Sequence, residues 1–159
     1  MATLPFLADS AAYNNWIALS PPKSEDFDVR SFVDNMQEVK LKMPPFRIGF
    51  YQLALLESGG GTVAQDGQTL ALGRYTLFFN LPGQIIYWDV PQNWRGYYFN
   101  LSESYYTVAI DGYPRLRDLP FFRRYTPPIS LPETEAHRLL TFFGELHGEY
   151  TQPLLTAHH

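Results

Sequence analysis

The chain lacks cysteine altogether among its 159 residues, which excludes a disulfide framework and a thiol nucleophile. Charged residues are scarce at 18%, and 12 basic against 16 acidic side chains leave a net charge of -4. This balance argues against a broad electrostatic surface for nucleic acid. No apolar run approaches the ~18 residues of a membrane-spanning helix, and the first residues, MATLPFLADS, hold no charged leader. We therefore expect a soluble, cytoplasmic protein with no membrane partner, which does not bind DNA by itself.

Residue patterns of catalysis are also missing. The histidines all lie near the C-terminus, at His137, His147, His158 and His159, and no G-x-S-x-G motif is present for a hydrolytic nucleophile. The glycine triplet at 59–61 is not followed by Lys-Ser/Thr, so it predicts a hairpin turn and not a phosphate loop. We expect no catalytic residues.

Turn residues, by contrast, are frequent between residues 59 and 93. Breaks at Gly59–Gly61, Asp66-Gly67, Gly73, Pro82-Gly83 and Pro91–Asn93 separate short runs rich in Tyr, Phe, Ile and Val. Such spacing reverses the chain before helical periodicity develops, and so predicts an antiparallel sandwich or barrel. The expected strands are two within 27–43, one at 48–57 covered on both faces, a hairpin of 62–66 and 68–72, and strands at 75–79, 85–90 and 96–101.

Two helices are expected outside this region. A short one over 10–19 belongs to an N-terminal arm, and a long one over 131–150 begins at a Ser130–Glu133 capping-box pattern. The long helix carries an apolar stripe, which packs either on the protein's own barrel or on a second subunit. Its members are Ala136, Leu139, Leu140, Phe143, Leu146 and Tyr150.

The order of motifs resembles one known family. The segment FYQLALLESGGGTVAQDGQTLALGRYTLFFNLPGQIIYW, followed by RGYYFNLSESYY, LPFFRRY and LPETEAHRLL, is similar to the N-terminal domain of AraC-type bacterial transcription regulators over roughly residues 27–150. The resemblance implies a mainly β fold, a cupin-type double-stranded β-helix (jelly roll) with a C-terminal α-helical extension. It also implies three parts: an N-terminal arm (1–26), a cupin β-barrel (27–128) and a C-terminal helical dimerisation segment (129–159).

The resemblance further implies a non-catalytic domain that binds a small-molecule effector and forms a homodimer, with DNA bound only through a helix-turn-helix domain beyond residue 159. Metal-binding cupins place His and Glu where this chain has Phe46, Ile48, Gln52 and Ile86, so we expect no metal and no cofactor. The competing hypothesis is a stand-alone, metal-free cupin enzyme of isomerase or epimerase type, for which the sequence offers no histidine in the barrel.

Candidate binding residues follow from the same resemblance. The expected ligand-binding residues are Trp88, Arg95, Tyr97, Gln52, Phe50 and Ile48. Rings together with a guanidinium suit a sugar, a carboxylate or an aromatic acid as effector, and core packing is the alternative role of each residue. The expected dimerisation residues are Leu139, Phe142, Phe143, Leu146 and Tyr150, and because Phe142 and Phe143 are adjacent, one of the two rings is expected to leave the barrel-facing side.

Overall fold

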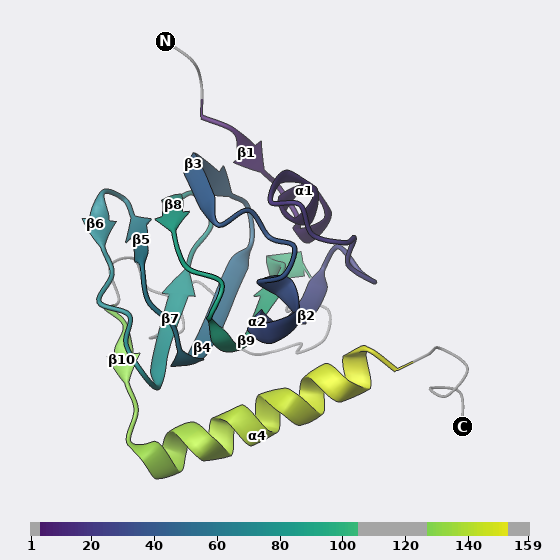
Figure 1. Cartoon of the computed structure of the whole chain (residues 1–159). Coiled ribbons are helices and arrows are strands. Elements are labelled where there is room, and N and C mark those ends of the chain that lie inside the picture. The colour runs from purple at the N-terminus through teal and green to yellow at the C-terminus, as the bar shows by residue number, and fades with distance from the viewer. Residues whose placement is uncertain (1–3, 105–126, 153–159) are drawn as a thin grey trace.

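Two five-stranded sheets and a long C-terminal helix form the domain in the computed structural model, which describes residues 4–104 and 127–152 (Figure 1). Thirteen elements occur in the described residues: β1 (Phe6–Leu7), α1 (Ser10–Trp16), β2 (Phe27–Ser31), α2 (Phe32–Asn35), β3 (Lys42–Ile48), β4 (Tyr51–Ser58), β5 (Thr62–Gln65), β6 (Gln68–Thr69), β7 (Thr76–Asn80), β8 (Ile85–Asp89), β9 (Arg95–Leu101), β10 (Ile129–Ser130) and α4 (Glu133–Tyr150).

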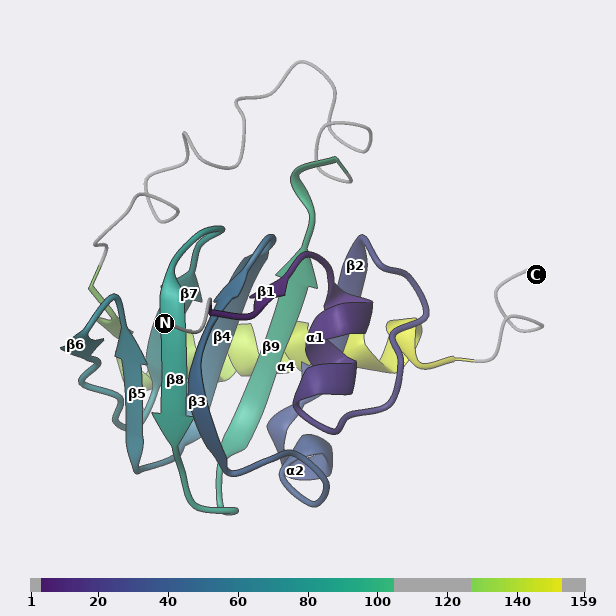
Figure 2. The same ribbon diagram turned by 90° about the horizontal axis from the view of Figure 1, so that it is seen from above.

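The sheets have the strand orders β1-β3-β8-β5-β6 and β10-β7-β4-β9-β2. Neighbouring strands are antiparallel except for β1, which pairs with β3 in parallel and so joins the N-terminal segment to the first sheet. Seen from above, the first sheet lies in front of the second, with α1 and α2 near β2 (Figure 2). The predicted cupin-type, mainly β fold with a C-terminal helix is confirmed.

The hairpin between β5 and β6 is formed as predicted. Asp66 and Gly67 both have positive φ, 51° and 83°, which is the conformation that a two-residue type I′ turn requires. The Asp66 side chain also accepts a hydrogen bond from the Ile85 backbone N–H at 2.9 Å, which fixes the turn to β8.

The predicted strand 48–57 is present from Tyr51 onward as β4, but its beginning is wrong, because the chain turns a corner between Ile48 and Tyr51. Ile48 ends β3, and Tyr51 begins β4 in the other sheet. The cause is a close approach at Gly49, whose N–H donates to Leu7 at 2.9 Å and where a Cβ would lie 2.8 Å from the Ala8 carbonyl oxygen. Only glycine fits against the arm at this corner.

The two strands predicted within 27–43 also need correction. β2 ends at Ser31, the short helix α2 follows, and β3 begins only at Lys42. Phe32 and Met36 are four residues apart and both buried, which is helical spacing that the strand alternation of the neighbouring residues concealed.

The predicted capping box is wrong too. Ser130 lies in β10 opposite Thr76, and α4 begins at Glu133 with Pro132 as its N-cap and no side-chain cap. A residue that precedes proline favours extended backbone, and Leu131 continues the strand by donating to the Tyr75 carbonyl at 2.9 Å. The proline therefore sets the start of the helix.

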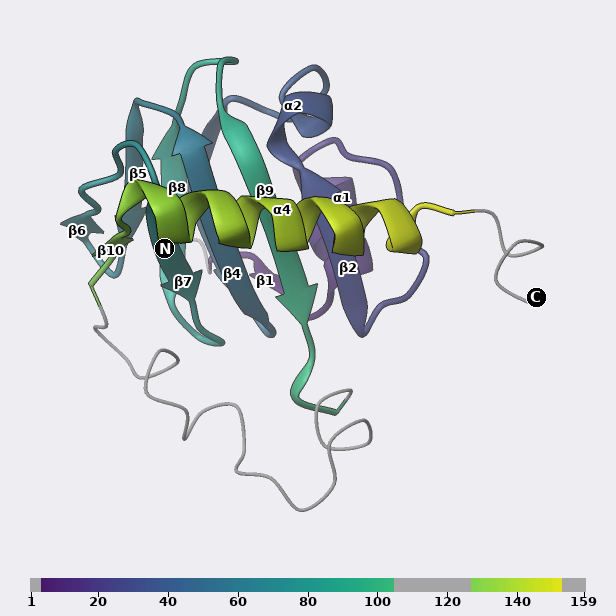
Figure 3. The ribbon, with the colours of Figure 1, turned by 90° about the horizontal axis from the view of Figure 1, so that it is seen from below.

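The helix α4 crosses the outer face of the second sheet, from β10 at one edge to β2 at the other (Figure 3). Ala136 and Phe143 are its buried residues. Gly144 lets the helix approach β9, since a Cβ there would lie 3.2 Å from the Tyr97 hydroxyl oxygen. This sheet is thus covered on both faces, by α4 outside and by the first sheet inside.

Candidate ligand-binding cavity

A cavity of about 80 Å³ lies inside the barrel. Its walls come from both sheets, and residues of α1, of α2 and of the segments that follow them also line it. The lining is mainly aromatic and aliphatic: Tyr13, Ile17, Phe32, Asn35, Met36, Val39, Gln52, Ala54, Val63, Phe78, Asn80, Ile86, Trp88, Val90, Trp94 and Tyr98. A concave, mostly apolar site with a few polar groups is the usual form of a small-molecule site.

The aromatic wall is held in a fixed arrangement. The indole N–H of Trp88 donates to the Lys40 carbonyl and that of Trp94 to the Gly60 carbonyl, both at 2.8 Å. Phe32 meets the Trp94 ring edge-on, with centroids 5.2 Å apart. Because the polar atom of each indole is bonded to backbone, the rings present apolar surface to the cavity.

A row of amide side chains crosses the inner face of the second sheet. Gln52 on β4 stands opposite both Asn80 on β7 and Asn100 on β9. It donates to Asn100 and accepts from Asn80, each at 2.9 Å, and Gln65 donates to Asn80 at 2.9 Å. These hydrogen bonds satisfy most of the buried amide groups, and the Asn100 Nδ2 group is buried without a partner in the row.

Two tyrosines supply the titratable groups of the cavity. Burial raises the pKa of Tyr13 to about 12, and a hydrogen bond with Gln52 opposes part of that rise. Burial also raises the pKa of Tyr98 well above its ordinary value, and Asn35 donates to its hydroxyl oxygen at 2.6 Å. Both hydroxyls are therefore neutral at physiological pH. No Asp, Glu, His, Lys or Arg is among the described residues that line the cavity.

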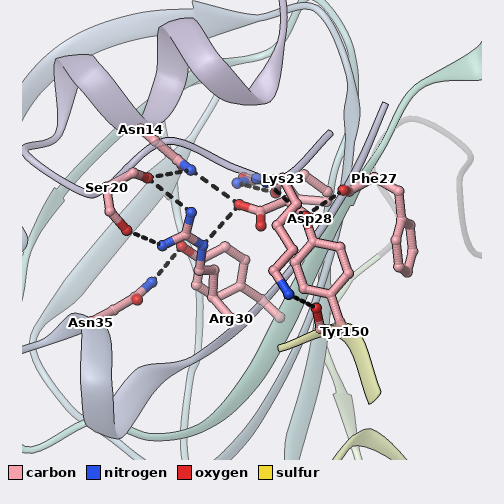
Figure 4. A network of polar contacts seen from close by, with 11 residues as sticks. Asn14, Ser20, Lys23, Phe27, Asp28, Arg30, Asn35 and Tyr150 are labelled. Carbon is pink, nitrogen blue, oxygen red and sulfur yellow. Dashed lines mark hydrogen bonds and ion pairs between the residues drawn. The ribbon is translucent and has the colours of Figure 1, made fainter. Parts of the chain in front are cut away.

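A polar network adjoins the cavity at the start of β2 (Figure 4). Asp28 is fully buried, pairs with the Arg30 guanidinium at 2.9 Å and accepts from the Asn14 amide of α1 at 3.0 Å. Arg30 also donates to the carbonyl and the hydroxyl oxygen of Ser20. The ion pair neutralises the buried carboxylate, and the hydrogen bond from Asn14 to Asp28 attaches α1 to β2.

The same short segment holds the end of α4. The Tyr150 hydroxyl donates to the Phe27 carbonyl at 2.9 Å, and the Lys23 amino group donates to the carbonyls of Tyr150 and Gln152 (Figure 4). Burial, and next the charge of Asp28, raises the pKa of Tyr150 to about 12. Residues 20–30 therefore contact the arm helix on one side and the C-terminal helix on the other.

Of the expected ligand-binding residues, Trp88 and Gln52 line the cavity. Ile48 and Phe50 belong to the adjacent hydrophobic core and are not among its lining residues. Arg95 is exposed, 3.9 Å from Glu57, and Tyr97 stacks against Phe143 of α4.

The residues of β9 that point into the barrel are the even-numbered ones. Gly96, Tyr98 and Asn100 are buried on the inner side, whereas the expectation had taken Arg95 and Tyr97 to face the cavity. The sequence reasoning also missed Tyr13 and Asn35, which come from the two short helices. The alternation of β9, anchored on the pairing of Asn100 with Gln52, is the signal from which Tyr98 could have been identified.

The expected dimerisation residues divide between two faces of α4. Phe143 is 3% exposed and stacks on Phe99 at 5.7 Å, whereas Phe142 is 59% exposed. Leu139 and Leu146 are half-buried and lie on the flank of the helix, between exposed Phe142 and the buried face of Phe143, and Tyr150 is bonded to β2 as described.

The positions at which metal-binding cupins carry ligands hold core residues here. Phe46, Ile48 and Ile86 are almost fully buried hydrophobic side chains, and Gln52 is part of the amide row. In residues 4–104 and 127–152, no cluster of three or more His, Asp or Glu could hold a metal ion. Within those ranges, too, every helix is either too short or too polar to cross a membrane.

Comparison with known proteins identifies the family of this chain. The model of the AraC-like ligand binding domain matches residues 40–158, which is more than half of the chain. No protein with a curated description gives a significant match. The LPFFRRY motif lies outside the described residues, but the barrel strands, the cavity and the final helix all fall largely within the matched range. The chain therefore belongs to the family of AraC-like ligand-binding domains, which have a cupin-type fold.

Proposed function

We propose that this chain is the non-catalytic effector-binding and dimerisation domain of a cytoplasmic, AraC-type bacterial transcription regulator. In such a protein the DNA contacts are made by a helix-turn-helix domain that follows residue 159. The observation that carries the proposal is the cavity inside the barrel, lined by rings and a few hydroxyl and amide groups, in a chain of the AraC-like ligand-binding family. The effector is a small molecule that occupies this cavity.

The chemistry of the cavity supports binding over catalysis. An isomerase or epimerase needs an acid and a base that exchange protons near neutral pH. The titratable side chains among the described lining residues are Tyr13 and Tyr98, and burial raises the pKa of both. No observation favours the enzyme hypothesis.

The outward face of α4 is our proposed dimer interface. Phe142 is exposed, and Leu139 and Leu146 lie half-buried beside it at helical spacing, so a two-fold axis at this side of the helix would bury the same patch on both copies. In this proposal residues 129–159 form the dimerisation segment, residues 27–128 the barrel and residues 1–26 the arm.

Sedimentation equilibrium tests the interface. We expect concentration-dependent dimers that are weakened by Phe142→Glu and by Leu146→Glu, with the fold preserved in circular dichroism. Thr141→Glu is the matched control, since it adds the same charge to an exposed neighbour that lies off the stripe. Monomers up to high micromolar concentration, or equal weakening by the control, would contradict this assignment.

Effector binding can reach the helix through residues 20–30. A ligand against Tyr13 and Ile17 bears directly on α1, α1 is tied to Asp28 through Asn14, and the adjoining Phe27 and Lys23 hold the end of α4. This gives a contact route from the cavity to the dimer helix, and contact alone does not measure coupling. We propose that the effector changes the pairing of two α4 helices and so the spacing of two DNA-binding units.

A screen for thermal stabilisation tests the binding function. The purified domain is screened against sugars, carboxylic acids and neutral cyclic compounds, beside an Ala54→Val variant whose added methyl groups reduce the cavity. At least one compound should raise the Tm of the native chain and not that of the variant, because a ligand stabilises the state that it binds. A screen without any such compound would count against the effector function itself.

A further inference from the structure

The lining of the cavity restricts the charge of its ligand. The Arg30 guanidinium, whose charge lowers the pKa of Tyr98, is already paired with Asp28, and Arg95 is exposed beside Glu57. A carboxylate ligand would therefore lose its hydration and gain no counter-ion from the described lining residues. The rise in the pKa of Tyr13 and Tyr98 has the same physical origin, since burial here disfavours a negative charge.

The lining also restricts the polar groups that a ligand can use. Gln52 and Asn80 exchange hydrogen bonds with each other and with the amides beside them. A sugar presents several hydroxyl groups that each need a partner, and most amide groups of the row are already occupied. The amide row therefore favours a ligand with few polar atoms.

The tyrosine hydroxyls remain as donors. Tyr98 accepts a hydrogen bond from Asn35, which leaves its own proton for another acceptor. The Tyr13 hydroxyl is hydrogen-bonded to the Gln52 side chain. Tyr13 and Tyr98 both line the cavity, and a negative charge on Tyr13 would raise the pKa of Tyr98. Together they supply two hydroxyl groups to a lining that otherwise consists of rings, aliphatic side chains and three amides.

The volume of the cavity limits the size of the ligand. The cavity of about 80 Å³ is smaller than the ~150 Å³ apolar cavity that accommodates benzene. A ligand of more than a few heavy atoms thus requires the lining side chains to move apart. Small rings fit with the least displacement.

We infer that the effector is a small, uncharged and largely hydrocarbon molecule whose single carbonyl or ether oxygen accepts hydrogen bonds from Tyr13 and Tyr98. This assignment rests on the proposed effector function and specifies its ligand class. It replaces the sugar, carboxylate and aromatic acid that an arginine in the cavity would have suited, because Arg95 is not there.

Nuclear magnetic resonance titrations of the ¹⁵N-labelled chain can test the assignment with four probes: cyclopentanone, cyclopentanecarboxylate, methylcyclopentane and ribose. The side-chain amides of Asn35, Gln52 and Asn80 and the indole N–H groups of Trp88 and Trp94 report binding at the cavity itself. We expect cyclopentanone to shift these signals and to bind at least about tenfold more tightly than the carboxylate or the sugar.

Substitution of the donors separates recognition of the oxygen from burial of the ring. Tyr98→Phe should weaken cyclopentanone about 3- to 10-fold, the effect of one hydrogen bond, and leave methylcyclopentane unchanged. If Tyr98→Phe is unstable because it loses the hydrogen bond from Asn35, the same comparison of the two ligands is made with Tyr13→Phe. Ala54→Val should weaken both ligands.

The possible contrary results have different meanings. Tighter binding of the carboxylate or of ribose at the cavity would overturn the ligand class while leaving the effector function intact. Ketone binding that neither tyrosine substitution changes, or that Ala54→Val leaves unaltered, would overturn the assigned contacts. If none of the four probes binds, the proposed ligand class is wrong. If, in addition, no compound in the wider thermal screen stabilises the chain, the proposed effector-binding function is wrong as well.

Discussion

Two adjacent rings of α4 should differ sharply in what they contribute to stability. Phe143 is 3% exposed and lies against Phe99 and Tyr97 of the sheet, whereas Phe142, the preceding residue, is 59% exposed. Truncation of a buried Phe to Ala costs about 3–5 kcal/mol, and surface substitutions stay within about 0.5 kcal/mol. For a chain of this size, Phe143→Ala should thus lower the Tm by roughly 6–20 °C.

Urea unfolding of the two alanine variants measures this difference. Far-ultraviolet circular dichroism follows the fold, and tryptophan fluorescence follows the barrel, at a protein concentration below that of dimer formation so that Phe142 is solvated. Both variants change the same residue type in the same helix, so helix propensity cancels between them. A loss below about 1 kcal/mol for Phe143→Ala, or equal losses for the two, would refute the packing of α4 as part of the cooperative unit.

Three further outcomes follow from other features. Burial raises the pKa of Tyr13 from 10 to about 12, so the unfolded state loses this proton first as pH rises. The free energy of unfolding should therefore fall by about 2–3 kcal/mol between pH 10 and 12. Urea titrations of Tyr13→Phe should show a smaller fall over the same pH range. Gly96→Ala should prevent stable folding, since φ is 130° and a Cβ would lie 2.1 Å from the Leu55 carbonyl oxygen, whereas Gly148→Ala on the open side of α4 should stabilise by about 0.5–1 kcal/mol in thermal melts. Elemental analysis of protein purified without chelators should find less than stoichiometric transition metal, and stoichiometric metal lost on substitution of barrel residues would contradict this.

Local signals in the sequence predicted most of the barrel. The Asp66-Gly67 turn needs two positive φ values, a demand that the two residues meet by themselves, and the hairpin is present as expected. The corner at Gly49 was not predictable in this way. It results from contact with Leu7 and Ala8, which lie some forty residues earlier in the chain, so no local pattern announces it.

The candidate site was predicted only in part, because alternation in a strand does not say which face is inner when both faces are covered. On β9, Tyr98 lines the cavity and Tyr97 packs under α4, so an aromatic residue occurs on each side. Asn100 would be read as outward by polarity alone, yet it is fully buried and bonded to Gln52. A buried amide row reverses the usual rule that apolar residues mark the inner face.

This double coverage also places the proposed ligand and the proposed dimer helix on opposite sides of one strand. Tyr98 borders the cavity, and its neighbours Tyr97 and Phe99 stack against Phe143 on the outer face. A displacement of β9 on the inside is therefore a displacement of the surface on which α4 rests, because closely packed interiors transmit small shifts. Residues 20–30 join the same helix to the arm at its other end through Tyr150. The helix α4 therefore rests on β9 and is held by residues 20–30, and each of these adjoins the cavity or the arm helix that lines it. A change in the position of α4 on the sheet would also reposition the exposed Phe142.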